Sequence, residues 1–554
     1  MYLRTISRRN RDGSTVRYLQ LAHNVWDPER GYARAEVVHS FGREDQLDRE
    51  ALARLVRSMS RFLDPDQALE ATAGSQLVFV GSRPLGGAWL LDQLWRRLGV
   101  PEAIGRAVGG RRLDPGVERV IFTLVANRAL APSSKLAALE WAAQDVALPG
   151  VGDLGGDPQV FYRAMDFLLD ADTAIQEQVF FAVANLLNLT VDVILFDTTS
   201  TYFETEDDDE FRRYGNSKDH RPDRPQVVVG LAVTREGIPV RCWSWPGNAA
   251  DTMVIRQVHD ELRDWRLHRV LWVGDRGFAS QTNRQYLQRA GGHVLFGEKL
   301  RAGADNLTTL ARPGRYAVVA DNLHVKEVWV GEGTTRRRFI VCRNLAEAER
   351  DRARRDKALA RLTTELAAIA GKTGDARLAA EGELLAHPTL RRYLTRRGGT
   401  LVVDTAAVSA DAKLDGKYLL SCTDDAIPAA DLALLYKSLL DVERCFRDLK
   451  HVIELRPIHH RKQQRIRAHV TVCFLALMLI RVAENTTGQT WPRIRRQMQR
   501  MHLGQFTGPA GHVTQRAETT PAQREILRAL HLKEPPIVLD LQPTTPPRRA
   551  RNRA

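Results

Sequence analysis

VDVILFD, residues 191–197, is the stretch that decides the fold this sequence predicts. A short apolar run of this kind is typical of a buried β-strand, and we expect the strand to end at Asp197. Two more strand-like runs follow, QVVVGLAVT at 226–234 and IPVRCWSWP at 238–246, with a turn at Gly237 between them. The three runs predict an antiparallel meander.

The next elements extend the meander into an α/β sheet. We expect a helix from about 251 to 265, a fourth strand, RVLWVGD, that ends at Asp275, a helix over 280–290 and a fifth strand at 293–297. This order predicts a ribonuclease-H-like sheet, in which the first and fourth strands lie side by side. Asp197 and Asp275 would then be neighbours, although an aspartate after a strand can also be only a turn or cap residue.

A third carboxylate comes from the stretch YKSLLDVERCFRDLK at 436–450, which we expect to be one helix. Seven residues make two turns, so Tyr436, Glu443 and Lys450 would share a face. A carboxylate between a phenol and an ammonium group suits a metal site beside a polyanion. A solvated amphipathic helix would carry the same mixture of charges.

Three carboxylates at one place need compensation, because like charges raise one another's pKa. Asp197, Asp275 and Glu443 offer hard oxygen donors, which suit Mg²⁺, with Mn²⁺ as a substitute. Two ions about 3.5–4 Å apart would activate an attacking oxygen and stabilise the leaving oxygen of an in-line displacement. No His or Cys residues are spaced for a zinc alternative.

The composition favours a globular protein with an acidic partner. The 554 residues carry a net charge of +14 with 44% hydrophobic and 27% charged residues. Such a basic excess favours nucleic acid, although an Arg-rich proteome would produce it too. The five cysteines form no CxxC pair, which fits a reducing cytoplasm. The apolar run at 470–480 is too short for a membrane span and predicts a buried helix.

The whole chain is predicted to be α/β: a ribonuclease-H-like catalytic core interrupted by a β-rich, mixed α/β insertion, with a small N-terminal β unit and a helical N-terminal region. The helical region fits either a helix-turn-helix DNA reader or a plain bundle. In order, we expect a β unit plus helix at 1–63, a linker at 64–77, the helical region at 78–185, the first part of the core at 186–299, the insertion at 300–425, the second part of the core at 426–485, a helical region at 486–533 and a disordered basic tail at 534–554.

The chain resembles bacterial insertion-sequence transposases of the DDE type, in particular the group with a Y-x2-R-x3-E-x6-K signature. Tyr436, Glu443 and Lys450 match that signature, but Leu439 stands where it has Arg. Other stretches that resemble the group's core motifs are FDTTSTYFE at 196–204, GNSKDHRPDRPQ at 215–226, PGNAADT at 246–252, DRGF at 275–278 and RPIHHRKQQRIRAH at 456–469.

The resemblance implies cut-and-paste DNA transposition in the bacterial cytoplasm, with the enzyme at the nucleoid when bound to DNA. The protein would bind terminal inverted repeats through residues 78–185, cleave the element ends and join them to target DNA, as at least a homodimer and without a membrane partner. Asp197, Asp275 and Glu443 would be catalytic and hold two Mg²⁺ ions.

Further residues would contact the DNA in this interpretation. Tyr436 and Lys450 would contact phosphates, and Arg444 or Arg447 would replace the missing signature Arg. Trp329 is the candidate for holding a flipped terminal base, or else it is a core residue of an alternating strand.

Two other functions share these residues. One is a metal-dependent DNA nuclease of the same fold without strand transfer. The other is an inactive DNA-binding relative, against which the three carboxylates argue.

Overall fold

The structure is a computed structural model that describes residues 1–11, 13–59, 78–109, 116–189, 191–267, 270–289, 291–333, 336–508 and 511–543. Two compact units divide the chain. The first comprises residues 1–81, 504–515 and 538–554, and the second comprises 82–503 and 516–537.

The first unit begins with an antiparallel three-stranded sheet, as the N-terminal strand-like runs predict. Turns separate the strands, which lie in chain order. The elements are β1 (Tyr2–Arg9), β2 (Thr15–Asp27), β3 (Tyr32–Arg43), the 3-10 helix η1 (Glu44–Gln46) and α1 (Arg49–Met59). The end of the predicted helix and the predicted linker at 64–77 lie outside the described residues.

A four-stranded sheet corrects two predictions about the C-terminal part. Its order is β18-β17-β16-β4, from β4 (Val78–Pro84), β16 (His502–Gly508), β17 (Gly511–Arg516) and β18 (Val538–Pro543). The region 486–533 is therefore not purely helical. The predicted disordered tail contains β18, because Leu539 and Leu541 alternate with polar residues, a strand pattern that the Pro-rich composition hid. Residues 544–554 lie outside the described part.

A single buried helix organises the second unit. The helix α17 (Gln463–Thr487) packs against α3, α5, α7, α8 and the strand β7 (Pro239–Pro246). In its most apolar stretch of 18 residues, 94% of the residues are buried. The prediction of a buried core helix at 470–480 is confirmed. The surrounding helices are α3 (Gly86–Arg97), α4 (Val100–Val108), α5 (Val117–Leu130), α6 (Lys135–Gln144), α7 (Gln159–Asp170), α8 (Asp172–Leu186), α18 (Trp491–Met498) and α19 (Pro521–Ala529).

The N-terminal helices therefore share one hydrophobic core with the sheet of the same unit. Every residue of α5 from Val120 to Leu130 is buried. A recognition helix must leave one face free for the DNA groove. Of the described helices in this region, α5 is thus excluded as a reader.

The central sheet has nine strands in the order β10-β11-β12-β15-β9-β8-β5-β6-β7. The strand β5 pairs antiparallel with β6, as β6 does with β7, whereas β5, β8 and β9 are parallel. The elements of this part are β5 (Val193–Tyr202), β6 (Gln226–Thr234), β7 (Pro239–Pro246), α9 (Asp251–Asp264), β8 (Leu271–Gly274), α10 (Gln281–Arg289) and β9 (His293–Glu298).

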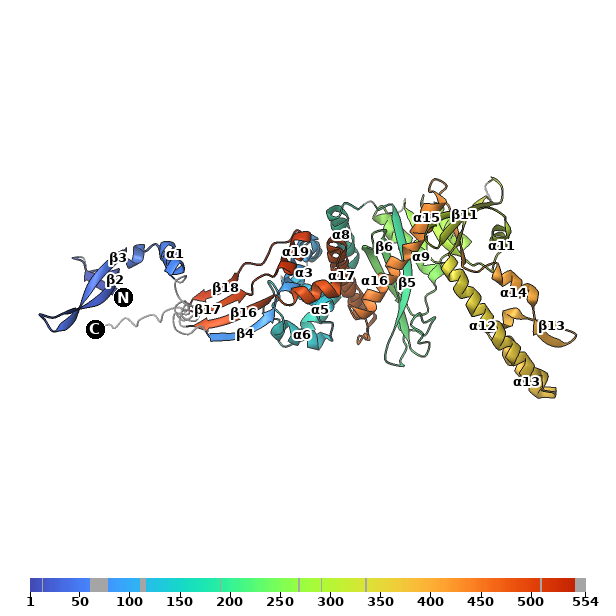
Figure 1. The fold of residues 1–554 in the computed structure, drawn as a ribbon, viewed down its shortest axis with the longest axis horizontal. Helices are drawn as coiled ribbons and strands as arrows, with labels where there is room; N and C mark the ends of the chain where they lie inside the picture. The colour runs from blue at the N-terminus through green and yellow to red at the C-terminus, as the bar shows by residue number, and fades with distance from the viewer. Residues whose placement is uncertain are drawn as a thin grey trace. The chain divides into compact units, whose positions relative to one another are not determined.

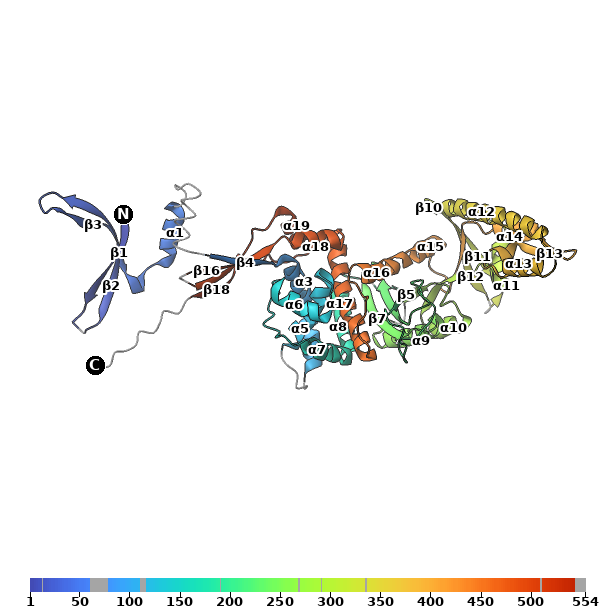
Figure 2. The ribbon, with the colours of Figure 1, turned by 90° about the horizontal axis from the view of Figure 1, so that it is seen from below.

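Helices cover both faces of this part of the sheet. Ile194 and Phe196 pack with α9 and α10, whereas Val193 and Leu195 belong to the core that includes α16 and α17. Alternate residues of a strand point to opposite faces. Figure 2 shows α15 and α16 on the side of β5 opposite to α9 and α10.

The predicted insertion at 300–425 is not a separate body, since four of its strands continue the central sheet beyond β9. The strand β15 returns to pair with β9, with Leu419 opposite Glu298, and β12, β11 and β10 follow. The elements are α11 (Ala304–Ala311), β10 (Ala317–Ala320), β11 (Leu323–Val330), β12 (Arg337–Arg343), α12 (Leu345–Ala370), α13 (Gly374–Ala386), the 3-10 helix η4 (Leu390–Tyr393), β13 (Leu394–Arg397), β14 (Thr400–Val403), α14 (Thr405–Ala412) and β15 (Lys417–Cys422).

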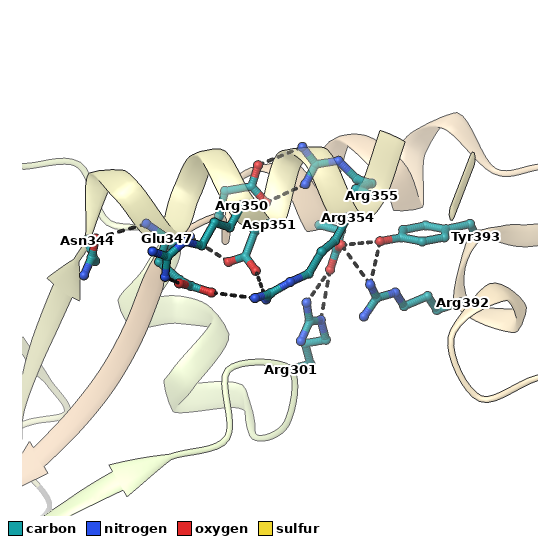
Figure 3. Close-up of polar contacts among 12 residues, drawn as sticks. Arg301, Asn344, Glu347, Arg350, Asp351, Arg354, Arg355, Arg392 and Tyr393 are labelled. Carbon is teal, nitrogen blue, oxygen red and sulfur yellow. Dashed lines mark hydrogen bonds and ion pairs between the residues drawn. The ribbon is translucent and has the colours of Figure 1, made fainter. Parts of the chain in front are cut away.

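Two small hydrophobic clusters lie within this region, one in the segment from α12 to β14 and one among β11, β12 and β15. Figure 1 shows α12 and α13 extending away from the strands of the central sheet. Polar contacts hold the first turns of α12 (Figure 3). The Asn344 side chain caps the helix by accepting the Glu347 N–H at 3.0 Å, and Arg354 pairs with Asp351 at 3.1 Å. These contacts stabilise a helix that has few buried residues.

The predicted single helix over 436–450 is two helices, α15 (Ala429–Lys437) and α16 (Leu439–His451). Around Ser438 the backbone makes i→i−3 bonds, Ser438 N–H to Leu435 O at 3.0 Å and Asp441 N–H to Ser438 O at 2.9 Å. Serine is a weaker helix former than leucine or lysine, which favours a break here. Tyr436 therefore lies on a different helix from Glu443 and Lys450.

A buried ion pair on α17 generates a stability prediction. Arg481 and Glu484 are 3% and 8% exposed and 2.8 Å apart, and Glu484 also accepts the Trp491 N–H at 2.7 Å. We expect Glu484→Ala to lower the free energy of unfolding by about 3–5 kcal/mol, because it leaves Arg481 buried without a counter-charge. Urea denaturation followed by tryptophan fluorescence measures the change.

The matched control is Glu365→Ala, which removes an exposed partner 3.6 Å from Arg361 on α12. It should cost less than about 1 kcal/mol. Equal losses from the two variants would show that the buried pair does not stabilise the core in this way.

Candidate active site

Asp197 and Asp275 lie at the point where β8 ends beside its parallel neighbour β5. The last register pair of β5 and β8 is Phe196 with Gly274, and Asp197 and Asp275 follow these two residues directly. Asp197 points to the same face as Leu195, the face that α15 and α16 cover. The prediction that β5 ends at Asp197 was wrong, since the strand continues to Tyr202 in pairing with β6.

The two aspartates are close enough to interact electrostatically. Burial raises the pKa of Asp197 to about 6, and the charges of Asp275 and Asp251 act in the same direction. The Lys218 ammonium and the Thr198 N–H, which donates to Asp197 at 2.7 Å, act in the opposite direction. A cation bound close to Asp197 and Asp275 would offset both the burial and the repulsion between their charges.

Tyr436 reaches the same place from α15. Its hydroxyl donates to the Asp275 Oδ1 at 3.3 Å. Burial and the nearby charge of Asp275 raise the pKa of Tyr436, so the phenol keeps its proton. Gly297 on β9 makes room for this hydroxyl, because a Cβ at Gly297 would lie 2.3 Å from the Tyr436 oxygen.

Lys450 contacts β5 two residues beyond Asp197. Its ammonium donates to Thr199 Oγ1 at 2.7 Å and to Asp219 Oδ1 at 2.8 Å. Arg456 holds the other oxygen of Asp219 at 3.0 Å. Tyr436 and Lys450 thus meet the same sheet face on either side of the segment that carries Glu443.

Glu443 itself is exposed on α16, and no other described residue bonds to its side chain. Among the described residues, no group of three or more His, Cys, Asp or Glu side chains is gathered closely enough to hold a metal ion. Arg447 is exposed and Arg444 is half-buried. Leu439 packs against the hydrophobic core, which a charged arginine at this position would not do in the same way.

Lys218 and Asp251 were not predicted as site residues. The Lys218 ammonium donates to the Thr198 hydroxyl at 2.7 Å and lies 3.6 Å from Asp197 and 3.9 Å from Asp251. The Thr198 hydroxyl in turn donates to Asp251 at 2.6 Å. Both residues lie in stretches noted in the sequence, 215–226 and 246–252, which line a cavity of about 420 Å³.

The contacts that the structure gives for the Trp329 ring are with Arg336 and Arg338, not with these site residues. Trp329 is half-buried on β11, and the Arg336 guanidinium stacks over its ring at 3.9 Å. Its role in holding a base stays a prediction.

Comparison with known proteins identifies a family. Residues 190–479, more than half of the chain, match the model of the transposase DDE domain. Residues 3–70 match the N-terminal domain of IS1634 family transposases. No curated protein matches the chain.

The protein therefore belongs to the DDE transposase family. Its N-terminal match places it among the bacterial insertion-sequence transposases of that type, so the predicted family is confirmed. Membership of this family implies that the protein acts on DNA.

The packing of Tyr436 over Gly297 gives a second prediction. We expect Gly297→Ala to destabilise the protein, because the new methyl group overlaps the Tyr436 hydroxyl. In a Tyr436→Phe background the same change should cost less, since the overlapping oxygen is absent. Thermal unfolding of the four proteins in this double-mutant cycle should give a coupling energy of about 1–2 kcal/mol.

Additivity of the two changes, within about 0.5 kcal/mol, would contradict this packing. Gly382→Ala serves as the control, since a Cβ there meets open space. It should behave the same in both backgrounds.

Proposed function

We propose that the protein catalyses cut-and-paste DNA transposition, by cleaving element ends and joining their 3′-hydroxyls to target DNA. The observation that carries this proposal is the pair Asp197 and Asp275 on neighbouring parallel strands, with Tyr436 and Lys450 on the same sheet face. Membership of the DDE transposase family supports the same reaction class.

The catalytic core is proposed to be ribonuclease-H-like. The strand order β7-β6-β5-β8-β9, with the first three antiparallel and the last three parallel, supports this. The helix α9 connects β7 to β8, and α10 connects β8 to its parallel neighbour β9, because parallel neighbours need a crossover connection, which is usually a helix.

Asp197 and Asp275 suit a hard divalent cation, because they follow neighbouring parallel strands and because burial, together with the nearby charge of Asp275, raises the pKa of Asp197. We propose that they hold Mg²⁺ together with Glu443, at two ions per site, with Mn²⁺ as a substitute. When bound, the ions would activate the attacking oxygen and stabilise the leaving oxygen. The contacts of Tyr436 and Lys450 bracket the Glu443 segment and support its place in this set.

The other side chains would position the DNA. A protonated Tyr436 can donate a hydrogen bond, and Lys450 supplies a positive charge on the same face. Lys218 holds the Thr198 hydroxyl and so fixes the backbone next to Asp197. Arg444 and Arg447 are the proposed substitutes for the missing signature Arg, and Trp329 is the proposed holder of a flipped base.

The proposed partners are terminal inverted repeats and target DNA, bound by at least a homodimer in the bacterial cytoplasm and at the nucleoid. Residues 78–185 are the proposed reader of the repeats. Exposed faces remain on α4, α6 and α7 of this region, whereas α5 is buried.

A cleavage assay tests the reaction. We expect Asp197→Ala, Asp275→Ala and Glu443→Ala each to reduce Mg²⁺-dependent cleavage of labelled element ends by about 10³-fold or more, while DNA binding persists. Asp223→Ala, which removes an exposed carboxylate paired with Arg221, is the matched control and should cleave normally.

Near-normal cleavage by any one of the three variants would remove that residue from the active site. Products joined to a target plasmid identify a transposase. Cleavage that stops at free 3′-hydroxyl ends would identify a nuclease instead.

A further variant tests the phosphate contact of Lys450. We expect Lys450→Ala to weaken end-DNA binding and to reduce the slope of log Kobs against log salt by about 1, since one phosphate contact is lost. Fluorescence anisotropy at several salt concentrations measures the slope. If the slope stays the same, Lys450 serves only the Thr199 and Asp219 contacts.

A further inference from the structure

A row of three basic side chains, of which Arg343 and Lys417 are cationic, crosses three neighbouring strands of the central sheet. His324 of β11, Arg343 of β12 and Lys417 of β15 are register partners. Partners in antiparallel strands point to the same face with their Cβ atoms about 4.5–5.5 Å apart. Arg343 and Lys417 are thus like charges directly opposite each other, an arrangement that destabilises a sheet.

The surrounding residues do not neutralise this row. The side chains of Arg343 and Lys417 make no hydrogen bond or ion pair with any other residue that the structure describes. Burial lowers the pKa of Lys417, and the charges of Lys326 and Arg343 lower it further. Positive charge therefore accumulates at this end of the sheet.

Two acidic groups that precede β15, Asp411 and Asp415, are already paired. Arg355 holds both oxygens of Asp415, at 2.5 and 2.7 Å, and Arg301 bonds to Asp411 at 2.5 Å (Figure 3). Tyr393 donates to the second oxygen of Asp411 at 2.5 Å. These contacts engage Asp415 and Asp411. Glu349 also lines the cavity beside Arg343 and Lys417, but it forms no ion pair with either of them.

Two cavities meet at Lys417 and connect the row to the candidate active site. One, of about 530 Å³, is lined by residues that include Asp275, Arg276, Lys299 and Lys417. The other, of about 560 Å³, is lined by residues that include Arg343, Arg352, Lys413 and Lys417. Basic side chains therefore line both cavities, from the neighbour of Asp275 to the end of β12; of these, Arg352 pairs with Asp356 and Arg301 with Asp411.

We infer that this row binds the phosphate backbone of duplex DNA beyond the scissile phosphate. The inference deepens the proposed function, on which it rests, by assigning the sheet end of the insertion to the DNA partner. A polyanion releases counterions when it meets such a row, which offsets the cost of holding like charges together. Phosphate contacts set position rather than sequence, so this binding is independent of sequence.

The test compares two double variants of the full chain. Arg343→Gln/Lys417→Gln removes two charges of the row. Lys372→Gln/Arg391→Gln removes two exposed cations whose side chains also form no hydrogen bond or ion pair with other described residues. Lys372 follows the end of α12, roughly 40 Å along that helix from Arg343.

Binding to a duplex of about 40 base pairs of unrelated sequence is measured by anisotropy between about 50 and 200 mM salt. We expect the first variant to reduce the slope of log Kobs against log salt by about 2 and the affinity by about tenfold or more. The second variant should leave both unchanged. An unchanged slope in the first variant, or an equal change in the second, would overturn the inference.

Thermal unfolding separates binding from folding. The midpoint of Arg343→Gln/Lys417→Gln should not fall, because the change removes repulsion across the strands. A fall of several degrees would show that the cations stabilise the fold and would also overturn the inference.

The same measurements separate this inference from the proposed function. Failure of the unaltered protein to bind duplex DNA would reject both. Binding with an unchanged slope in the variant would reject only the role of the row. A reduced slope in a protein whose unaltered form cleaves no element ends would reject only the catalytic proposal.

Discussion

The parallel pairing of β5 with β8 is the constraint on which the candidate site depends. The strand β8 has only four residues, all buried, and it stops after Gly274 while β5 continues along β6. A side chain at Gly274 would press on Phe278 and Phe296, each 3.2 Å from the added carbon. Because β8 ends before β5, Asp197 and Asp275 follow neighbouring residues of the two strands. Tyr436 and Lys450 contact the protein close to this point.

The sequence predicted the parts of the fold that depend on local periodicity. The start of β5, Val193 to Phe196, and the middle of β6 are continuous apolar runs, and α17 contains an apolar segment too long for a strand. The neighbouring aspartates followed from the order of strands. These features need no knowledge of which distant residues pair.

The parts that were missed depend on long-range register or on loops. Whether β15 pairs with β9 is decided by register between distant segments, so the sequence predicted the insertion but not that its strands extend the central sheet. Lys218 comes from an irregular loop, and no periodic pattern shows that it reaches Thr198. The seven-residue spacing from Tyr436 assumed an unbroken helix, and the bonds around Ser438 break it.

The continuity of the central sheet has a mechanical consequence. A segment joined by a flexible linker can swing, but β15 is joined to β9 by a ladder of backbone hydrogen bonds. Moving the insertion away from Asp275 would require breaking that ladder. Leu420 of β15 pairs with Gly297, the residue that lies against the Tyr436 hydroxyl, and Leu419 pairs with Glu298. The continuous sheet thus fixes the distance between the two aspartates and the strands of the insertion.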